Sequence, residues 1–345
     1  ADAIQQAVDA AVTDDLVKIA GTCAGVSQRG GTWQTVYVDK PLTLRGGYAP
    51  DAWSMPDPTA YAFLDAQGDG RVLLITGPIA VTVERLDIAH GDATGLGGGP
   101  WSYDGAGGGI YVVSATVTLR DNYIHDNVAG RNAWSGGGGV YLYGSQATLE
   151  RNDIFGNTAG MSTTAGLSGE GGGLALSASH VTMIRTMIKD NFASNAGFGI
   201  GGGLYVEDGS LAGDGNFLQG NIAGPTAQGW GGGIFAGFGS SSALVNTVFK
   251  DNASGATPNS RGAALLLEVA SMDLRHTTFV NNTGGNGSGV YVYGDSTVYL
   301  TNTLMSGHTT AISVESGSAA TLAGILWHNT VIPTAGAGAI NVSTV

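Results

Sequence analysis

The sequence predicts an all-β solenoid, with each repeat forming one coil of a parallel β-helix. Three observations carry this prediction. A glycine-rich stretch such as GGGLYV at 201–206 recurs seven times along the chain. The first glycine of each stretch is followed, after 20 or 21 residues, by an asparagine or, in the last repeat, by a histidine. The residues after the glycines alternate with a period of two, as strands do, and loops of varying length join the constant units.

The elements follow in chain order. The first segment, 1–13, places Ile4, Val8 and Val12 at helical spacing. We expect an amphipathic helix here that covers the N-terminal end of the solenoid, which would otherwise expose a bare sheet edge. The rest of a single domain, 1–345, divides into three parts: irregular N-terminal coils at 34–106, regular glycine-rich coils at 107–308 and short C-terminal coils at 309–345.

Composition and charge argue against several function classes. The chain has 14 basic and 27 acidic residues and a net charge of −13, without a Lys/Arg cluster, which is unfavourable for binding nucleic acid or an anionic membrane. No apolar run is long enough to span a bilayer. Cys23 is the only cysteine, so no intramolecular disulfide can form and the sequence shows no cysteine-based metal motif. We expect no nucleic-acid partner, no direct membrane insertion, no cofactor and no metal.

The repeat resembles that of the right-handed parallel β-helix proteins of the pectate-lyase-like superfamily, in the glycine-rich form GGG-hydrophobic followed by N-x-I-x-x-N. Examples are GGGVYL at 137–142 with RNDIFGN at 151–157, and the segment AIQQAV at 3–8 is also similar to the start of such chains. The resemblance covers essentially the whole chain and implies a right-handed coil. It also implies an extracellular or cell-surface location, as in polymorphic surface proteins. It implies no single activity, because the fold hosts lyases, hydrolases, epimerases, adhesins and passive stalks.

The recurring asparagines are expected to form a structural column inside the solenoid. Stacked coils place equivalent residues about 4.8 Å apart, so each amide can donate to one neighbour and accept from the other. The glycines are expected to turn corners, since a phosphate cradle would need one glycine loop followed by a helix. The column consists of Asn127, Asn157, Asn191, Asn221, Asn252 and Asn282.

The outward-facing residue of the strand after the glycines is usually aromatic or aliphatic, which gives a stripe on the order of 30 Å long. This stripe is either a cross-strand ladder beneath the variable loops or a contact surface for a sugar chain or another subunit. Tryptophans in the loops before the glycines would line its rim or plug the loops. The surface candidates are Tyr111, Tyr141, Tyr205, Phe235, Tyr291, Trp134 and Trp230.

Three carboxylates are the catalytic candidates. Glu207 and Glu268 would face the same way two coils apart, roughly 10 Å at the backbone, near the separation that an inverting glycosidase needs. Asp208 lies beside Glu207. The alternative is that all three are solvated acids on a sheet rim. The aspartate, HG and RIK set of polygalacturonases, the R-x-P-x-x-R of pectate lyases and the DPHE of alginate epimerases are missing, and the six histidines show no ligand spacing.

The sequence therefore favours an exported, non-catalytic structural or adhesive module. The alternative is a polysaccharide-active enzyme (a lyase or glycoside hydrolase), or a carbohydrate-binding module, that uses the outward stripe. The last strand-like segment, 339–345, ends without a helix or polar cap. We expect either that the natural chain continues or that another subunit stacks there, so the expected partners are the chain itself or a surface glycan.

Overall fold

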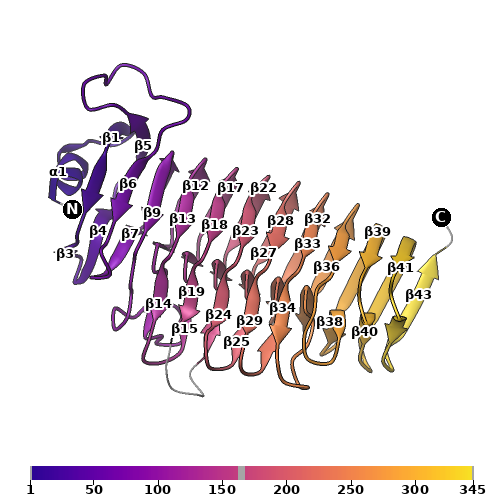
Figure 1. Ribbon diagram of the computed structural model, residues 1–345. Coiled ribbons are helices and arrows are strands. Elements are labelled where there is room, and N and C mark those ends of the chain that lie inside the picture. Colours follow the sequence, from indigo (N-terminus) through magenta and orange to yellow (C-terminus); the bar gives the residue numbers. More distant parts are fainter. Residues whose placement is uncertain (1, 162–167, 344–345) are drawn as a thin grey trace.

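The computed structural model describes residues 2–161 and 168–343, which form one elongated parallel β-helix (Figure 1). All pairings between named strands of the described residues are parallel except the hairpin of β3 (Ser27–Arg29) with β4 (Thr32–Val38). The coils stack in chain order from the N-terminal to the C-terminal end of the solenoid. The predicted fold class, a single right-handed parallel β-helix with a short N-terminal helix, is confirmed.

Helix α1 (Asp2–Ala10) packs at the N-terminal end of the solenoid, beside β4 and β1 (Asp15–Ala20). Ile4 and Val8 join the main core, as expected. Val12 does not, because the helix ends at Ala10 and leaves the Val12 side chain 67% exposed. The reason is local: the carboxylate of Asp15 accepts a hydrogen bond from the Val12 amide at 2.8 Å and turns the chain into the first strand. Within the described residues, no helix has the length and apolarity needed to cross a membrane.

The largest sheet has 21 strands and forms two adjoining columns along the solenoid. Its strands are β1, β2 (Thr22–Ala24), β5 (Leu42–Tyr48), β6 (Ala62–Asp65), β8 (Ala80–Glu84), β9 (Leu86–Ala89), β12 (Thr116–Arg120), β13 (Tyr123–His125), β17 (Gln146–Glu150), β18 (Asp153–Phe155), β22 (His180–Ile184), β23 (Met187–Lys189), β27 (Ser210–Asp214), β28 (Phe217–Gln219), β32 (Ser241–Val245), β33 (Val248–Lys250), β36 (Ser271–Arg275), β37 (Thr278–Val280), β39 (Thr297–Ser306), β41 (Ala319–His328) and β43 (Ala339–Ser343).

A 12-stranded sheet holds the strands that follow the glycines, and two 5-stranded sheets hold the short strands before and after each loop. The 12-stranded sheet contains β3, β4, β7 (Arg71–Thr76), β11 (Ile110–Val113), β16 (Val140–Tyr143), β21 (Leu174–Ser177), β26 (Leu204–Glu207), β31 (Ile234–Gly237), β35 (Leu265–Glu268), β38 (Ser288–Tyr293), β40 (Thr310–Val314) and β42 (Ile332–Ala335). One small sheet contains β10 (Gly105–Ala106), β15 (Ser135–Gly136), β20 (Gly169–Glu170), β25 (Gly199–Ile200) and β30 (Gly229–Trp230). The other contains β14 (Val128–Gly130), β19 (Thr158–Gly160), β24 (Phe192–Ser194), β29 (Ile222–Gly224) and β34 (Ala253–Gly255).

In the regular coils, the glycines before each strand of the 12-stranded sheet turn a corner. Gly201 has φ +68°, and a Cβ built on it would lie 2.3 Å from the carbonyl oxygen of Leu204. At Gly202 a Cβ would lie 2.4 Å from the carbonyl oxygen of Gly232 in the next coil. Both distances are far below van der Waals contact, so the tight corner and the close approach of coils require residues without a side chain.

The recurring asparagines lie one above another in the buried interior. From Asn127 to Asn252, each side-chain amide donates to the side-chain oxygen of the next asparagine, ending at Asn282, at 2.9–3.0 Å. The same amide nitrogens also donate to backbone carbonyls of the preceding coil, as Asn157 does to Ile124 at 2.8 Å. This arrangement satisfies the polar groups of a turn from which water is excluded.

His308 takes the place of an asparagine at the C-terminal end of this ladder. Its Nε2 lies 3.4 Å from the Asn282 side-chain nitrogen, and its Nδ1 has no hydrogen-bond partner among the described residues. Burial lowers the pKa of this imidazole to about 4. The folded protein therefore holds a neutral imidazole between pH 4 and pH 6.5, where the unfolded chain binds a proton. The free energy of unfolding should fall as the pH decreases through that window, by at most about 3 kcal/mol.

His308→Asn tests this expectation, because an asparagine extends the ladder and does not titrate. Urea unfolding of both proteins at pH 7.5 and pH 5 should show a smaller acid-induced loss of stability in the variant. Other titrating groups are common to both proteins and cancel in the comparison. Equal losses in the two proteins would show that His308 is not the group responsible.

Candidate functional site

The outward aromatic stripe is covered rather than exposed. Tyr111, Tyr141, Phe235 and Tyr291 are each at most 8% exposed, and they belong to a second hydrophobic cluster outside the main core. Residues from the segments before the glycines, such as Ile200, pack on this cluster and form its cover. Of the two alternatives for this stripe, the burial of these side chains fits a ladder beneath the loops and does not fit a continuous exposed contact surface.

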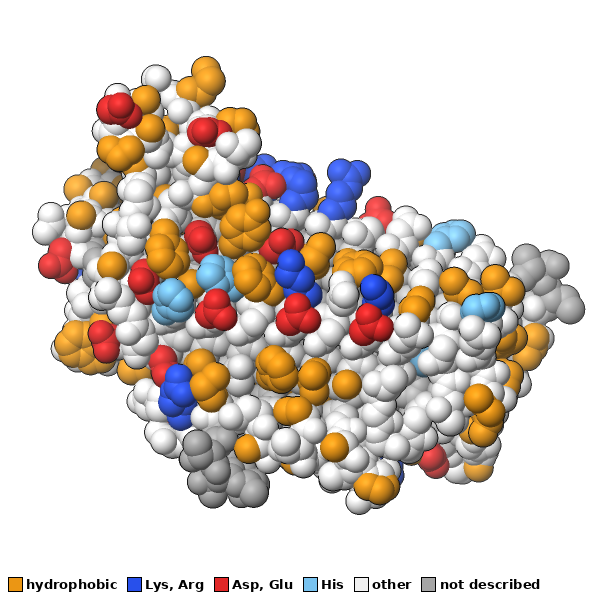
Figure 2. All heavy atoms as spheres, in the orientation of Figure 1, with side chains coloured by type: hydrophobic (Ala, Val, Ile, Leu, Met, Phe, Trp, Pro, Cys, Tyr) orange, Lys and Arg blue, Asp and Glu red, His pale blue; other side chains and the backbone are white. Residues whose placement is uncertain are grey.

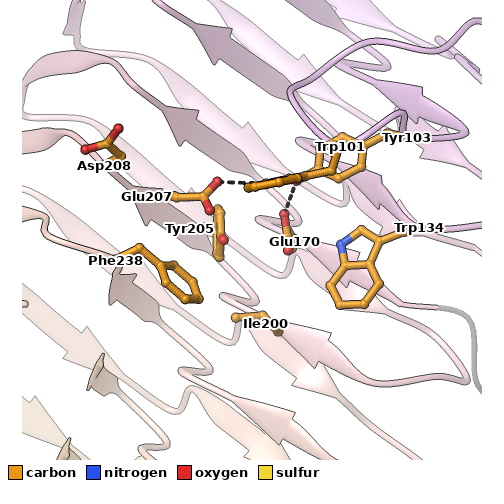
Figure 3. Close-up of a pocket in the computed structure, with 9 residues that line it drawn as sticks. All are labelled: Trp101, Tyr103, Trp134, Glu170, Ile200, Tyr205, Glu207, Asp208 and Phe238. Carbon is orange, nitrogen blue, oxygen red and sulfur yellow. Dashed lines mark hydrogen bonds between the residues drawn. The ribbon is translucent and has the colours of Figure 1, made fainter. Parts of the chain in front are cut away.

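A pocket of about 740 Å³ opens through this cover (Figure 3). Most of its lining side chains are aromatic or aliphatic, and three are acidic. The lining residues are Trp101, Tyr103, Trp134, Glu170, Ile200, Tyr205, Glu207, Asp208 and Phe238.

Two of the acids come from neighbouring coils. Glu170 ends strand β20, immediately before the glycine corner, and pairs in register with Ile200 of the next coil. Glu207 ends strand β26, which follows the glycine corner of that next coil, and pairs in register with Ser177. The corner folds the short strand back over the outer face of the long one. As a result, two glutamates far apart in the repeat pattern line the same pocket (Figure 3).

Glu170 is 5% exposed in apolar surroundings. Burial raises the pKa of its carboxyl to about 7; the charge of Glu207 acts in the same direction, and the hydrogen bond from Tyr103 opposes it. Burial also raises the pKa of Tyr103, so its hydroxyl remains a donor to the Glu170 carboxylate. Around neutral pH the Glu170 carboxyl therefore exists in both protonation states, which suits a group that gives and takes a proton.

Glu207 is 7% exposed, and burial raises the pKa of its carboxyl above the ordinary value. Two neutral donors oppose that rise: the indole nitrogen of Trp101 at 3.5 Å and the hydroxyl of Ser177 at 3.3 Å, both to Oε2. The charge of Asp208 raises the pKa further. No cation contacts either glutamate among the hydrogen bonds and ion pairs of the described residues.

The loop that carries Trp101 and Tyr103 is fixed to the solenoid by a buried arginine. Arg71 is 1% exposed, and its guanidinium donates to the carbonyl oxygens of Ala106, at 2.8 Å, and of Gly97. It also lies 5.0 Å from the centre of the Tyr111 ring, and the Tyr111 hydroxyl accepts a hydrogen bond from the Gly99 amide at 2.9 Å. Within the described residues, the buried charge of Arg71 has no carboxylate partner, and its donors instead hold the base of the loop.

The sequence-derived site residues divide into those that meet in the pocket and those that do not. Glu207, Asp208, Tyr205 and Trp134 line it. Glu268 does not; it lies two coils from Glu207 in register, through Gly237, and is half-buried. The other surface candidates outside the pocket are buried or packed in aromatic contacts: Tyr111, Tyr141, Phe235, Tyr291, and Trp230 against Phe198 with ring centres 5.0 Å apart.

Sequence reasoning missed Glu170, whose position carried a usable signal. The residue just before the glycines is Ala106, Gly136, Ile200 or Trp230 in other coils of the same small sheet. A charged residue in an otherwise apolar or small column is expensive to bury and marks a special site. Tyr103, Ile200 and Phe238 gave no such signal, because each is an ordinary apolar or aromatic residue in a loop or strand.

Outside the pocket, many acidic and basic side chains form ion pairs with one another. Figure 2 shows acidic and basic side chains interspersed over the face turned to the viewer, without a large patch of one sign. An example is Arg151, whose Nε lies 2.7 Å from Asp121. Across residues 2–161 and 168–343, no group of three or more His, Cys, Asp or Glu side chains is arranged to hold a metal ion. The aromatic pocket is therefore the best candidate site in the described part of the chain.

Comparison with known proteins gives a fold-level likeness. A family described as "Right handed beta helix region" matches residues 102–249. No curated protein sequence matches the chain. Among solved structures, the A-module of the mannuronan C-5 epimerase AlgE4 of Azotobacter vinelandii is 13% identical. That match covers 99% of this chain and 95% of that one, with a TM-score of 0.50.

Two further structures align over similar lengths. An alginate lyase from Paenibacillus sp. is 12% identical, over 99% of this chain and 96% of that one, with a TM-score of 0.38. The surface protein and adhesin PfbA of Streptococcus pneumoniae is 9% identical, over 99% and 94%, with a TM-score of 0.40. At these identities the likeness extends to the fold and no further.

Proposed function

We propose that this chain, a right-handed parallel β-helix protein, binds a polysaccharide in the aromatic pocket and hydrolyses one of its glycosidic bonds there. The observation that carries the proposal is the pair Glu170 and Glu207, two buried carboxyl groups in one open, aromatic-lined pocket that have no cationic partner in the part of the chain that the structure describes. A concave apolar site with a few converging polar groups of perturbed pKa is the usual form of a binding or catalytic site.

The aromatic lining supports the binding part of the proposal. Trp101 is 68% exposed and Trp134 is 40% exposed, so both offer ring faces to solvent at the pocket mouth. The side chain of Tyr205 also lines the pocket and lies beside the two glutamates (Figure 3). Flat apolar ring faces bury the C–H faces of a sugar ring, and the carboxylates below can accept hydrogen bonds from its hydroxyls.

The two glutamates support the chemical part. In the proposed reaction, the bond between the anomeric carbon and the glycosidic oxygen breaks as Glu170, protonated, gives its proton to the leaving oxygen. Water adds to the anomeric carbon and passes a proton to the Glu207 carboxylate, whose negative charge faces the positive charge that develops on the sugar. Proton exchange with solvent then restores both groups. The pKa of about 7 suits Glu170 to the role of acid.

A second function, glycan binding without turnover, is favoured by one specific observation. Both carboxylates accept hydrogen bonds from a single loop, Glu207 from Trp101 and Glu170 from Tyr103. They would then hold this loop over the pocket and do no chemistry. This function agrees with the adhesive or structural role that the sequence favours. In either case the ligand is a polysaccharide, so we place the protein outside the cell or on its surface.

One screen separates the two functions. Neutral and acidic polysaccharides and their oligosaccharides are titrated while tryptophan fluorescence is followed, and the same mixtures are assayed for new reducing ends. We expect saturable binding with release of reducing ends. Trp134→Ala should weaken binding roughly tenfold through loss of a ring face, whereas Trp53→Ala, which alters an exposed tryptophan stacked near Tyr48 outside the pocket, should not.

The outcomes lead to different conclusions. Binding without new reducing ends from any bound polysaccharide would leave only the second function. Binding that is insensitive to Trp134→Ala would mean that the glycan occupies another surface. If no polysaccharide binds, both functions are rejected.

A further inference from the structure

We infer that the pocket selects glycans without carboxylate or other anionic groups, so that its substrate is a neutral polysaccharide. The inference rests on the proposed function, because it names the substrate class of the same site. Its basis is the charge of the residues that a bound sugar would meet.

The pocket lining is acidic and has no compensating cation. Glu170, Glu207 and Asp208 are among the nine lining residues, and none of the nine is Lys, Arg or His. Side chains that bind uronate carboxylates are typically arginine, through paired hydrogen bonds, or lysine. A uronate in this pocket would find neither.

The cations near this face of the solenoid are engaged elsewhere. Arg71 is buried, and its donors hold the carbonyl oxygens at the base of the loop. Arg131 pairs with Asp92 at 2.6 Å, and Arg261 lies over the ring of Tyr291, 4.9 Å from its centre. None of these three lines the pocket.

Glu207 keeps its charge effect because its partners are neutral, and Glu170, which is only partly ionised around neutral pH, adds to that effect. Glu207 accepts from the Trp101 indole and the Ser177 hydroxyl, and Glu170 accepts from the Tyr103 hydroxyl. These donors carry no net charge, so the negative potential of the pocket is uncompensated. In an apolar site of reduced dielectric, a ligand carboxylate a few ångströms away is repelled more strongly than it would be in water. The net charge of −13 on the whole chain acts in the same direction at longer range.

The test measures binding of two matched sets of hexasaccharides by tryptophan fluorescence at low ionic strength. The neutral set has glucose, mannose, galactose and xylose backbones, and the acidic set has galacturonate, mannuronate and guluronate backbones. The best neutral ligand should bind more tightly than every acidic one, by a factor on the order of ten to a hundred. Added salt should reduce this difference in affinity between neutral and acidic ligands, because it screens the repulsion.

Two substitutions in the pocket and one control outside it locate the effect. Asp208→Asn removes a lining charge at a position with φ +47°, which asparagine tolerates well. It should reduce the affinity difference between neutral and acidic hexasaccharides severalfold. Asp251→Asn makes the same change at a similar φ of +53° outside the pocket, beside Lys250, and should leave this difference unchanged. Glu207→Gln should reduce the difference further.

The possible results are distinct. An acidic hexasaccharide that binds as tightly as the best neutral one, or more tightly, would overturn the inference and leave the proposed function standing. A preference for neutral chains that Asp208→Asn and Glu207→Gln do not change would also overturn it, since the pocket charges would not be the cause. Absence of binding by every hexasaccharide would reject the proposed function and the inference together.

Discussion

Replacing Glu170 by Gln is expected to lower the turnover of a bound polysaccharide about 10²- to 10⁴-fold while changing glycan affinity only severalfold. The amide keeps the size of the side chain and can still accept the hydrogen bond from Tyr103. It has no acidic proton to give to the leaving oxygen. The loss should therefore appear in kcat and not in binding, as expected for a group that acts mainly in the transition state.

The pH dependence gives this prediction a second readout. In the unaltered protein, turnover should decline as the pH rises through about 7, where Glu170 loses its proton, and should decline again in acid as Glu207 becomes protonated. The alkaline decline should be absent from the residual activity of the variant. The substitution should not destabilise the protein at pH 8. The raised pKa means that the folded state binds a proton between about pH 4.5 and pH 7 that the unfolded state releases, so this contribution to stability is lost as the pH rises.

Glu268→Gln is the matched control for this experiment. Glu268 occupies the same register column as Glu207, two coils along the solenoid, but lies outside the pocket. We expect its replacement to leave turnover within about twofold. If Glu268→Gln loses activity and Glu170→Gln keeps it, the assignment of Glu170 as the acid is contradicted. The result would instead support Glu207 and Glu268 as the catalytic pair, as the sequence suggested.

Asn191→Ala should destabilise the solenoid by on the order of 3–5 kcal/mol. The side chain donates to Ile154 at 2.9 Å and to Asn221 at 3.0 Å, and its oxygen accepts from both nitrogens of Asn157 at 3.0 Å. All four hydrogen bonds are buried. Alanine leaves the Asn157 backbone amide and the Ile154 carbonyl with unsatisfied hydrogen-bonding capacity where water cannot reach them.

Chemical unfolding followed by circular dichroism measures this loss. Asn132→Ala is the control: it removes the same side chain from an exposed loop position and should change stability by less than about 0.5 kcal/mol. Hydrogen exchange should show lost protection mainly in the coils that flank Asn191, because coils interact with their nearest neighbours. Destabilisation of Asn191→Ala by no more than the control would contradict a stabilising role for the buried amide ladder.

The sequence was sufficient for the fold because the repeat constrains every coil at once. Strict period-two alternation after the glycines identified which residues face the interior, and Ile110, Val140 and Leu174 indeed stack in register there. The N-terminal helix followed from its apolar spacing. Its end did not, because the short-range hydrogen bond between Val12 and Asp15 overrides the helical pattern.

The site was only half predictable from the sequence. Period-two alternation says that Tyr141 points out of the solenoid, but not whether another segment covers it. The covering segment has no periodicity, and its path depends on loops such as the one held by Arg71. Glu207 was identified because the alternation places it at an outward-facing position at the end of a strand. Glu170 was missed because it lies on the far side of the glycine corner, and the corner brings the two together only in three dimensions.

The most direct test is a crystal structure of the Glu170→Gln variant with the neutral hexasaccharide that binds most tightly. We predict a sugar ring held between Trp101 and Trp134, with a glycosidic oxygen within hydrogen-bond distance of the side chain at position 170 and the Glu207 carboxylate facing the adjacent anomeric carbon. An oligosaccharide bound along another face of the solenoid, with the pocket empty, would contradict the assignment of this pocket as the functional site.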